Sequence, residues 1–289
     1  MGAKPDINRS TAGVLFPKDI SSQIWAKTLE TSAIMQLATK TSMPTNGQTF
    51  QTIVGEPEAK WVGETAKKPV SKHTFGNRSV MPYKMAVIEP FSMEFVRDKR
   101  ALYDQCVNRL PFALSKLFDT TILGTTAPGE NFDVLGDCDK VSIAANQYDT
   151  FVDIDAAIGS ADGMLSGIAL GPKGRSLLLK AKDNQGNPLF TPGVESGTLG
   201  NILGAPVAVK KQVHVAGTPN IVGIAGDFSD AFYAIADGIK FSVSDVATIT
   251  IDGAAVNLWE QNMVAVRVEA EFGFYVKNKA EFKLLTDQA

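Results

Sequence analysis

The stretch MVAVRVEAEFGFYV, residues 263–276, carries the most regular pattern in the chain. Apolar residues occupy every second position and form one set: Val264, Val266, Val268, Ala270, Phe272, Phe274 and Val276. Mostly charged residues stand in the other set: Arg267, Glu269, Glu271 and Tyr275. Because successive side chains of a strand point to opposite faces, this alternation predicts a long, half-buried β-strand. The segment AEFKLL, residues 280–285, predicts a second strand after it.

Far upstream, residues 47–95 also follow a β pattern, interrupted by glycines and prolines, and we expect a long hairpin there. Its middle, GETAKKPVSKHT (63–74), contains a single apolar residue larger than alanine. Such a segment buries too little surface on its own to offset the entropy lost when it becomes ordered. A projecting loop of this length therefore predicts a partner that holds it or a function that requires it.

Residues 98–124 predict the longest helix of the protein. Its apolar positions recur at helical intervals: Leu102, Cys106, Leu110, Leu114, Leu117 and Leu123. Asp98 stands where an N-cap is expected, and Gly124 stands at the predicted stop. Pro111 lies inside the segment and is expected to bend the helix or split it in two, because proline has no backbone donor.

Residues 125–258 alternate between helical and β patterns. We expect two helices, 153–165 and 172–183, with a strand at 168–171 between them. Short β runs follow at 205–213, 221–228, 231–236 and 240–251. At the other end of the chain, the first 20 residues have no sustained period and residues 20–38 predict a short helix. This N-terminus is typical of an arm that needs a neighbour to become ordered.

The composition is that of a globular protein, with 289 residues, 44% hydrophobic and 20% charged. No apolar stretch reaches the roughly 18 residues that a spanning helix needs, and the N-terminus has no export signal, so we expect no membrane association. The chain has 28 basic and 31 acidic residues. Its net charge of −3 lacks the excess of positive charge that is typical of proteins that wrap nucleic acid. Any relation to DNA is therefore expected to be indirect.

Two cysteines and two histidines limit the chemistry that the chain can perform. Cys106 and Cys138 are too few and too far apart for a zinc cluster or a disulfide framework. Cys106 is expected in the core and Cys138 in a polar loop as a free thiol, while His73 and His214 are expected in a loop and beside a turn. The sequence contains no nucleotide-binding or catalytic motif, and it predicts no cofactor and no metal.

The order of these features resembles one family, the major capsid proteins of tailed double-stranded DNA bacteriophages, with the Hong Kong 97 fold. The resemblance rests on five collinear segments, at 59–98, 170–193, 203–209, 226–244 and 262–285, with the long helix after the first. It implies an α+β fold with four parts: an N-terminal arm at 1–45, an extended loop at 46–90, a peripheral domain with a long spine helix at 91–129 and 251–289, and an axial domain at 130–250.

The resemblance implies a structural protein and not an enzyme. Copies are expected to assemble into hexamers and pentamers of an icosahedral head, part of the virion, which is built in the host cytoplasm and encloses the genome without specific DNA binding. Scaffolding, portal and decoration proteins are the implied partners; scaffolding comes from a separate protein or from a segment removed before residue 1. Two alternatives remain open: an encapsulin-type compartment that packages an enzyme, and a hydrolase using a Ser or Asp of the α/β region, which lacks a nucleophile motif.

One covalent activity exists in that family, an isopeptide cross-link between a lysine and an asparagine of adjacent subunits, assisted by a glutamate. By resemblance, Lys68, Asn262 and Glu269 take these positions. The reaction needs a deprotonated amine and a carboxylate that accepts its proton. Asn262 and Glu269 are seven residues apart, so an unbroken strand would place them on opposite faces, which favours a site shared among subunits.

The alternative for these three residues is an ordinary surface role: a loop charge, a strand start and a solvated carboxylate. Trp61, Lys67, Lys68 and Lys72 are expected to form an intersubunit contact, in which Trp61 is the large anchor. The alternative for the lysines, together with Lys60, is a role as solubilising or rim charges, each contributing less than about 1 kcal/mol.

Overall fold

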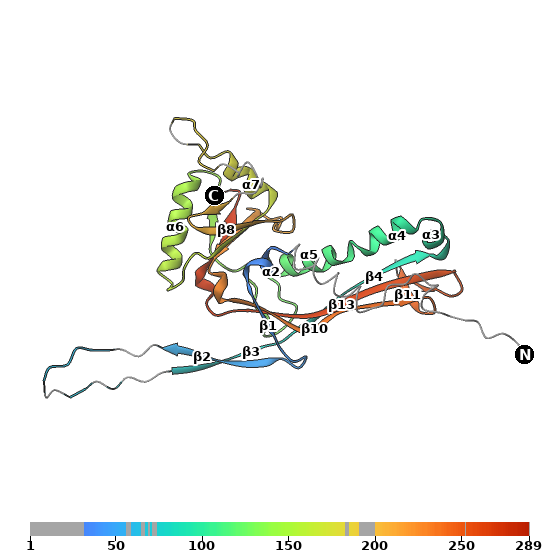
Figure 1. Cartoon of the computed structure of the whole chain (residues 1–289), viewed down its shortest axis with the longest axis horizontal. Helices are drawn as coiled ribbons and strands as arrows, with labels where there is room; N and C mark the ends of the chain where they lie inside the picture. The colour runs from blue at the N-terminus through green and yellow to red at the C-terminus, as the bar shows by residue number, and fades with distance from the viewer. Residues whose placement is uncertain are drawn as a thin grey trace, which may run out of the picture.

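The computed structural model describes residues 32–55, 59–64, 67–68, 70, 74–182, 185–190, 200–251 and 253–288. Most of the expected N-terminal arm, with the first part of the expected helix at 20–38, therefore lies outside the described residues. The described chain is elongated, with a long sheet, a separate head and a projecting hairpin (Figure 1). No helix in the described part is long and apolar enough to cross a membrane.

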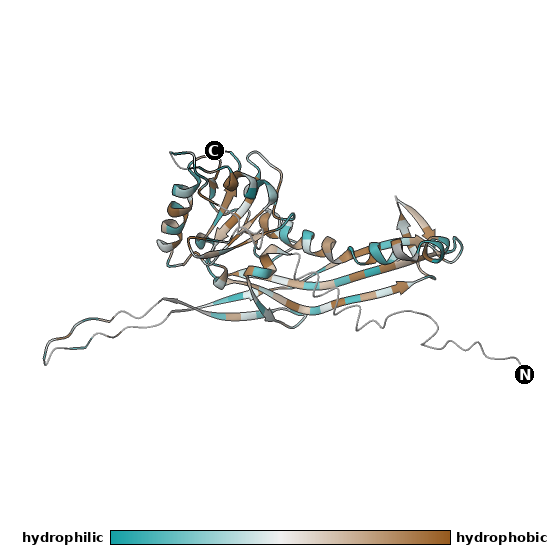
Figure 2. Ribbon diagram, turned by 45° about the horizontal axis from the view of Figure 1, so that its top comes forward, coloured by the Kyte–Doolittle hydropathy of each residue, from teal (hydrophilic) through white to brown (hydrophobic). Residues whose placement is uncertain are grey.

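A four-stranded sheet forms the long axis of the molecule (Figure 1). Its strand order is β1 (Thr39–Ser42), β10 (Ala231–Ser244), β13 (Met263–Val276) and β4 (Tyr83–Ser92). All seven apolar residues predicted for one face of β13 are buried, and Arg267 on the other face is exposed. Figure 2 shows this alternation of hydrophobic and hydrophilic residues along the long strands. The predicted half-buried strand is confirmed.

Three successive helices, and not one long helix, follow β4: α3 (Met93–Asp98), α4 (Arg100–Val107) and α5 (Leu110–Leu123). The expected interruption by Pro111 is confirmed, since the helix breaks before it and Pro111 lies in the first turn of α5. Gly124 ends α5 as predicted. The expected N-cap at Asp98 is wrong: Asp98 ends α3, and the Ser92 side chain caps that helix by accepting from the Phe95 amide at 3.1 Å.

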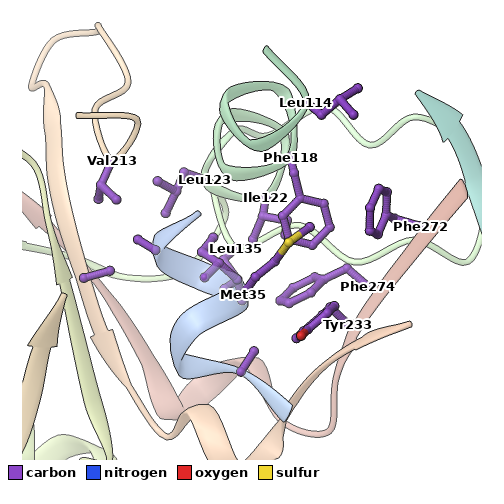
Figure 3. Close-up of a cluster of buried hydrophobic side chains, with 14 of the residues drawn as sticks. Met35, Leu114, Phe118, Ile122, Leu123, Leu135, Val213, Tyr233, Phe272 and Phe274 are labelled. Atoms are coloured by element: carbon purple, nitrogen blue, oxygen red, sulfur yellow. The ribbon is translucent and has the colours of Figure 1, made fainter. Parts of the chain in front are cut away.

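The buried face of α5 also differs from the expected one. Leu110 and Leu114 are buried, but Leu102 and Leu117 are each 47% exposed. Phe118 and Ile122 continue the buried row, because residues four apart lie on one face of a helix. Figure 3 shows Phe118 and Ile122 beside Met35, with Phe272 and Phe274 next to them.

The head contains a six-stranded sheet in which most neighbouring strands are not consecutive in the sequence. Its strand order is β5 (Lys140–Ser142), β14 (Phe282–Thr286), β9 (Ile221–Gly226), β6 (Gly167–Leu170), β8 (Ala205–Val209) and β7 (Asn201–Ile202). Helices α6 (Gln147–Gly159) and α7 (Pro172–Leu179) bury apolar residues in one cluster with it. The predicted helix at 153–165 thus begins and ends six residues earlier. Two single-turn helices, η1 (Phe228–Asp230) and η2 (Lys279–Glu281), precede β10 and β14.

Two strands depart from the domain bounds expected from the sequence. β10 lies in the long sheet, although residues 130–250 are assigned to the axial domain, and β14 lies in the head sheet, although residues 251–289 are assigned to the peripheral domain. Each strand pairs with the neighbour that buries its apolar residues, so the chain passes between the two sheets more than once.

The expected hairpin at 47–95 is shorter than predicted. β2 (Gln48–Gly55) pairs antiparallel with β3 (Thr74–Val80), whereas β4 leaves the hairpin and pairs with β13. A second small hairpin, β11 (Thr248–Ile251) with β12 (Ala254–Asn257), lies at the far end of the long sheet (Figure 1).

A buried carboxylate joins the start of the described chain to α5. The Asp119 side chain accepts from the Ser32 hydroxyl at 2.6 Å and from the Ala33 amide at 3.0 Å, at the start of α2 (Ala33–Leu37). Both Asp119 and Ser32 are fully buried. This contact ties the start of α2 to the buried face of α5.

Candidate intersubunit surface

The tip of the extended hairpin presents apolar side chains to solvent. Trp61 is fully exposed, Val70 is 85% exposed and Val62 is 38% exposed. Monomeric proteins seldom leave an indole uncovered on a projecting loop, because a tryptophan buries 150–250 Å² when it packs. The described part of the hairpin tip is therefore a surface suited to contact with another chain.

Lysines surround these apolar side chains. Lys60, Lys67 and Lys68 line a shallow depression of about 480 Å³ together with Trp61 and Val70. Lys67 and Lys68 are exposed, while Lys72 and His73 lie outside the described residues. Trp61 therefore lies with Lys67 and Lys68 on one surface of the hairpin, and the intersubunit contact expected of them stays a prediction.

An aromatic stack anchors the base of the hairpin to the long sheet. The ring of Tyr275 in β13 lies between Phe50 of β2 and Phe232 of β10, with both centroid distances at 4.9 Å. Tyr275 is buried, although its position in the alternating stretch predicts the solvated face. The sequence analysis missed this anchor because Phe50, which stacks on Tyr275, lies more than 200 residues upstream.

A polar contact beside the stack holds the other strand of the hairpin. Arg78 of β3 forms an ion pair with Asp133, whose carboxylate also accepts from the Val276 amide at 2.9 Å. The turn that begins the hairpin requires Gly47, which has a φ of 81° and leaves no room for a Cβ beside the Met81 sulfur. The hairpin therefore projects from a rigid base.

Asn262, the predicted cross-link acceptor, lies in a turn before β13 and not within a strand. Its φ is 52°, and its side-chain amide donates to Oε1 of Glu94 at 2.5 Å. Hydrogen bonds from the Glu94 backbone amide and from Asn262 hold the pKa of Glu94 below its usual value. Glu94 is a neighbour that the sequence analysis did not find, because the two residues are 168 positions apart.

Glu269 lies on β13, opposite Ala86 of β4 and Lys240 of β10. Its side chain is 18% exposed and pairs with Arg267 at 3.5 Å. Within one subunit the structure does not bring Lys68, Asn262 and Glu269 together: the extended hairpin and the turn before β13 lie at opposite ends of the molecule (Figure 1). Any reaction among them requires adjacent copies.

The cysteines and His214 contribute no reactive site in the described structure. Cys138 is a free thiol as expected, but it is buried, and burial raises the pKa of its thiol to about 11. Cys106 is only partly buried, at the margin of the core. A ring nitrogen of His214 lies 3.2 Å from the carbonyl of Ile221. Among the described residues, no group of three or more His, Cys, Asp or Glu side chains is placed to hold a metal ion.

The long sheet covered by helices, the separate head and the projecting hairpin define a shell subunit of the Hong Kong 97 fold. A solved structure from Gordonia phage Cozz superposes with a TM-score of 0.74, covering 90% of this chain and 87% of that chain at 19% identity. The phage capsid family matches residues 12–287, and the chain belongs to this family.

Two relatives of known sequence carry the same description, probable major capsid protein gp17. The protein of Mycobacterium phage D29 is 32% identical to this chain, and that of Mycobacterium phage L5 is 30% identical. Each alignment covers 95% of this chain and 90% of the relative. The resemblance found in the sequence is confirmed, and the chain is a structural capsid protein and not an enzyme.

Proposed function

We propose that this chain is the major shell subunit of a phage head, and that its copies form hexamers and pentamers around double-stranded DNA. The observation that supports this assembly is the extended hairpin, which carries Trp61 and Val70 uncovered on a rigid base. Burial of apolar surface contributes roughly 25 cal/mol per Å², so docking of the hairpin tip on a neighbour stabilises the assembly and leaves the isolated subunit unaffected.

Deletion of residues 63–74 tests this role. We expect a soluble, folded subunit with an unchanged melting temperature that no longer forms shells in electron micrographs. Replacement of the exposed Trp259 by Ala serves as the control, since it removes an indole outside the hairpin. Normal particles from the deletion variant would refute the role of the hairpin, and an absence of particles from the unaltered chain in the presence of its scaffolding protein would refute the function itself.

The finer organisation belongs to the same proposal. We assign the N-terminal arm to residues 1–45 and the extended loop to residues 46–90. We assign β10 to the peripheral region, with the long sheet, and β14 to the axial region, with the head sheet. Scaffolding, portal and decoration proteins are the proposed partners, and the host cytoplasm is the proposed place of assembly. The family membership favours a phage head over an encapsulin-type compartment.

We also propose that Lys68 of one subunit cross-links to Asn262 of another. The neutral amine nitrogen attacks the carboxamide carbon and a new C–N bond forms; Glu269 of a further copy accepts the proton of the amine and passes it to the carboxamide nitrogen, whose C–N bond breaks as ammonia leaves. Support comes from the exposure of Lys68 and Asn262 on opposite ends of the molecule, where adjacent copies can reach them.

Denaturing electrophoresis of mature particles tests the cross-link. We expect covalent ladders from the unaltered chain and a linked peptide pair lighter by one ammonia. Lys68→Arg keeps the charge but removes the usable amine, so the ladders should vanish while particles persist; Lys67→Arg is the matched control. A single band near 31 kDa from DNA-filled particles would eliminate the cross-link and leave Lys68 as a surface charge.

A further inference from the structure

The carboxamide of Asn262 is held by a hydrogen bond within the subunit, although both partners face solvent. Its nitrogen donates to Oε1 of Glu94 at 2.5 Å, and the side chains of Asn262 and Glu94 are both exposed. An ionised carboxylate only accepts hydrogen bonds, so the group that it contacts is the nitrogen end of the carboxamide. This nitrogen is the one that leaves as ammonia in the proposed cross-link.

The backbone of Asn262 is also held in place. Its φ of 52° lies in the left-handed region, which asparagine adopts more readily than most residues. Its carbonyl accepts from the Met93 amide at 2.9 Å, and its own amide donates to the Trp259 carbonyl at 3.4 Å. With the backbone fixed on both sides, the remaining freedom of Asn262 is rotation of its side chain, and the contact with Glu94 restricts that rotation.

Glu94 is a fixed acceptor because its own surroundings hold it. It lies in the first turn of α3, which the Ser92 side chain caps, and its own backbone amide donates to its carboxylate. Met263 of β13 lies opposite Ser92 of β4, so the pairing of these strands brings the turn before β13 to the start of α3 (Figure 1). The register of the long sheet therefore determines that Glu94 meets Asn262.

Glu269 cannot hold the carboxamide of Asn262 in the same subunit. It stands seven residues further along the chain, and at about 3.3 Å per residue of strand the two lie roughly 23 Å apart. Its side chain pairs with Arg267. Within one subunit, the carboxylate that touches the cross-link acceptor is that of Glu94.

We propose that Glu94 is a positioning residue of the cross-link, which holds the leaving nitrogen of Asn262 so that the carbonyl carbon meets the Lys68 amine of an adjacent copy in one orientation. Glu94 forms and breaks no covalent bond, and proton transfer stays with Glu269. This inference rests on the proposed cross-link and adds one residue to its site. A free carboxamide samples three χ1 wells and two χ2 orientations, so fixing one of them speeds the reaction about sixfold.

Three replacements of Glu94 test this role through the rate at which covalent ladders form in assembled particles. Glu94→Ala removes the acceptor, and Glu94→Asp keeps the charge but shortens the side chain by one methylene. Both should slow the ladders about sixfold. Glu94→Gln loses the charge but keeps the length and an acceptor oxygen, so it should rescue the rate to within about twofold of the unaltered chain.

Two further variants serve as controls. Asp98→Ala removes an exposed carboxylate at the other end of α3 and should leave the rate unchanged. Asn262→Gly keeps the left-handed backbone and removes the carboxamide, so the subunit should fold and form no ladders. Hydrogen exchange of the Met93 amide, which donates to the Asn262 carbonyl, should be equal in the unaltered chain and the Glu94 variants.

An unchanged rate in Glu94→Ala would overturn the proposal. A normal rate in Glu94→Asp with a slow one in Glu94→Gln would also overturn it, because the charge and not the position would then matter. So would slow ladders that appear only together with faster exchange of the Met93 amide, since loss of local structure would explain them. Particles of the unaltered chain without any ladders would instead eliminate the cross-link itself, a failure that is visible before Glu94 is changed.

Discussion

Asp119 is a buried carboxyl whose ionisation is linked to stability. Burial raises its pKa from 3.8 to about 6, against the opposing effects of the Ser32 hydroxyl, the backbone amides of Ala33 and Ile34, and the charge of Lys210. A raised folded-state pKa contributes stability that is fully present below pH 3.8 and is lost as the pH rises through about 6. The difference between the two pKa values corresponds to about 3 kcal/mol in the free energy of unfolding.

Asp119→Asn removes this titration. We expect the stability of the variant, relative to the unaltered subunit, to improve by about 2.4 kcal/mol between pH 4 and pH 7, as measured by urea denaturation at each pH. Asp287→Asn is the control, because Lys173 and Asn220 hold the pKa of Asp287 at about 2 and its relative effect should stay constant in that range. A constant difference for Asp119→Asn would show that burial does not shift this group.

The extended hairpin shows how one element depends on another far away in sequence. Its base is held by the stack of Phe50, Tyr275 and Phe232, in which Tyr275 is buried. We expect Tyr275→Ala to cost about 3 kcal/mol of stability, since it removes a buried aromatic ring, and to speed amide hydrogen exchange in β2 and β3 most strongly.

Hydrogen exchange followed by mass spectrometry measures this effect peptide by peptide. Trp259→Ala, at a position 71% exposed, should change stability by less than about 0.5 kcal/mol and leave the hairpin amides unchanged. Equal exchange of β2 and β3 in the two variants would mean that the ion pair of Arg78 with Asp133 holds the hairpin without the stack.

For the whole molecule, the net charge of −3 determines how strongly the free subunit binds DNA. Non-specific affinity comes mainly from phosphate neutralisation by Lys and Arg, which this chain balances with an excess of carboxylates. We expect duplex binding weaker than about 1 µM in a mobility-shift assay at physiological salt, without sequence preference. Tighter, salt-sensitive binding would reveal a basic surface that the net charge conceals.

The sequence by itself determined those features that depend on local spacing. The alternation at 263–276 determined which residues of β13 are buried, and the missing donor of Pro111 separated α4 from α5. The order of the segments along the chain also predicted the family, because the same segments follow one another in the same order in its members.

Only the tertiary structure decided which distant segments meet. It placed β10 in the long sheet and β14 in the head sheet, buried Cys138, and brought Glu94 to Asn262 and Ser32 to Asp119. The physical reason is that a periodic pattern states which face of an element is apolar, but not which other element covers that face. The partner depends on the packing of the whole chain.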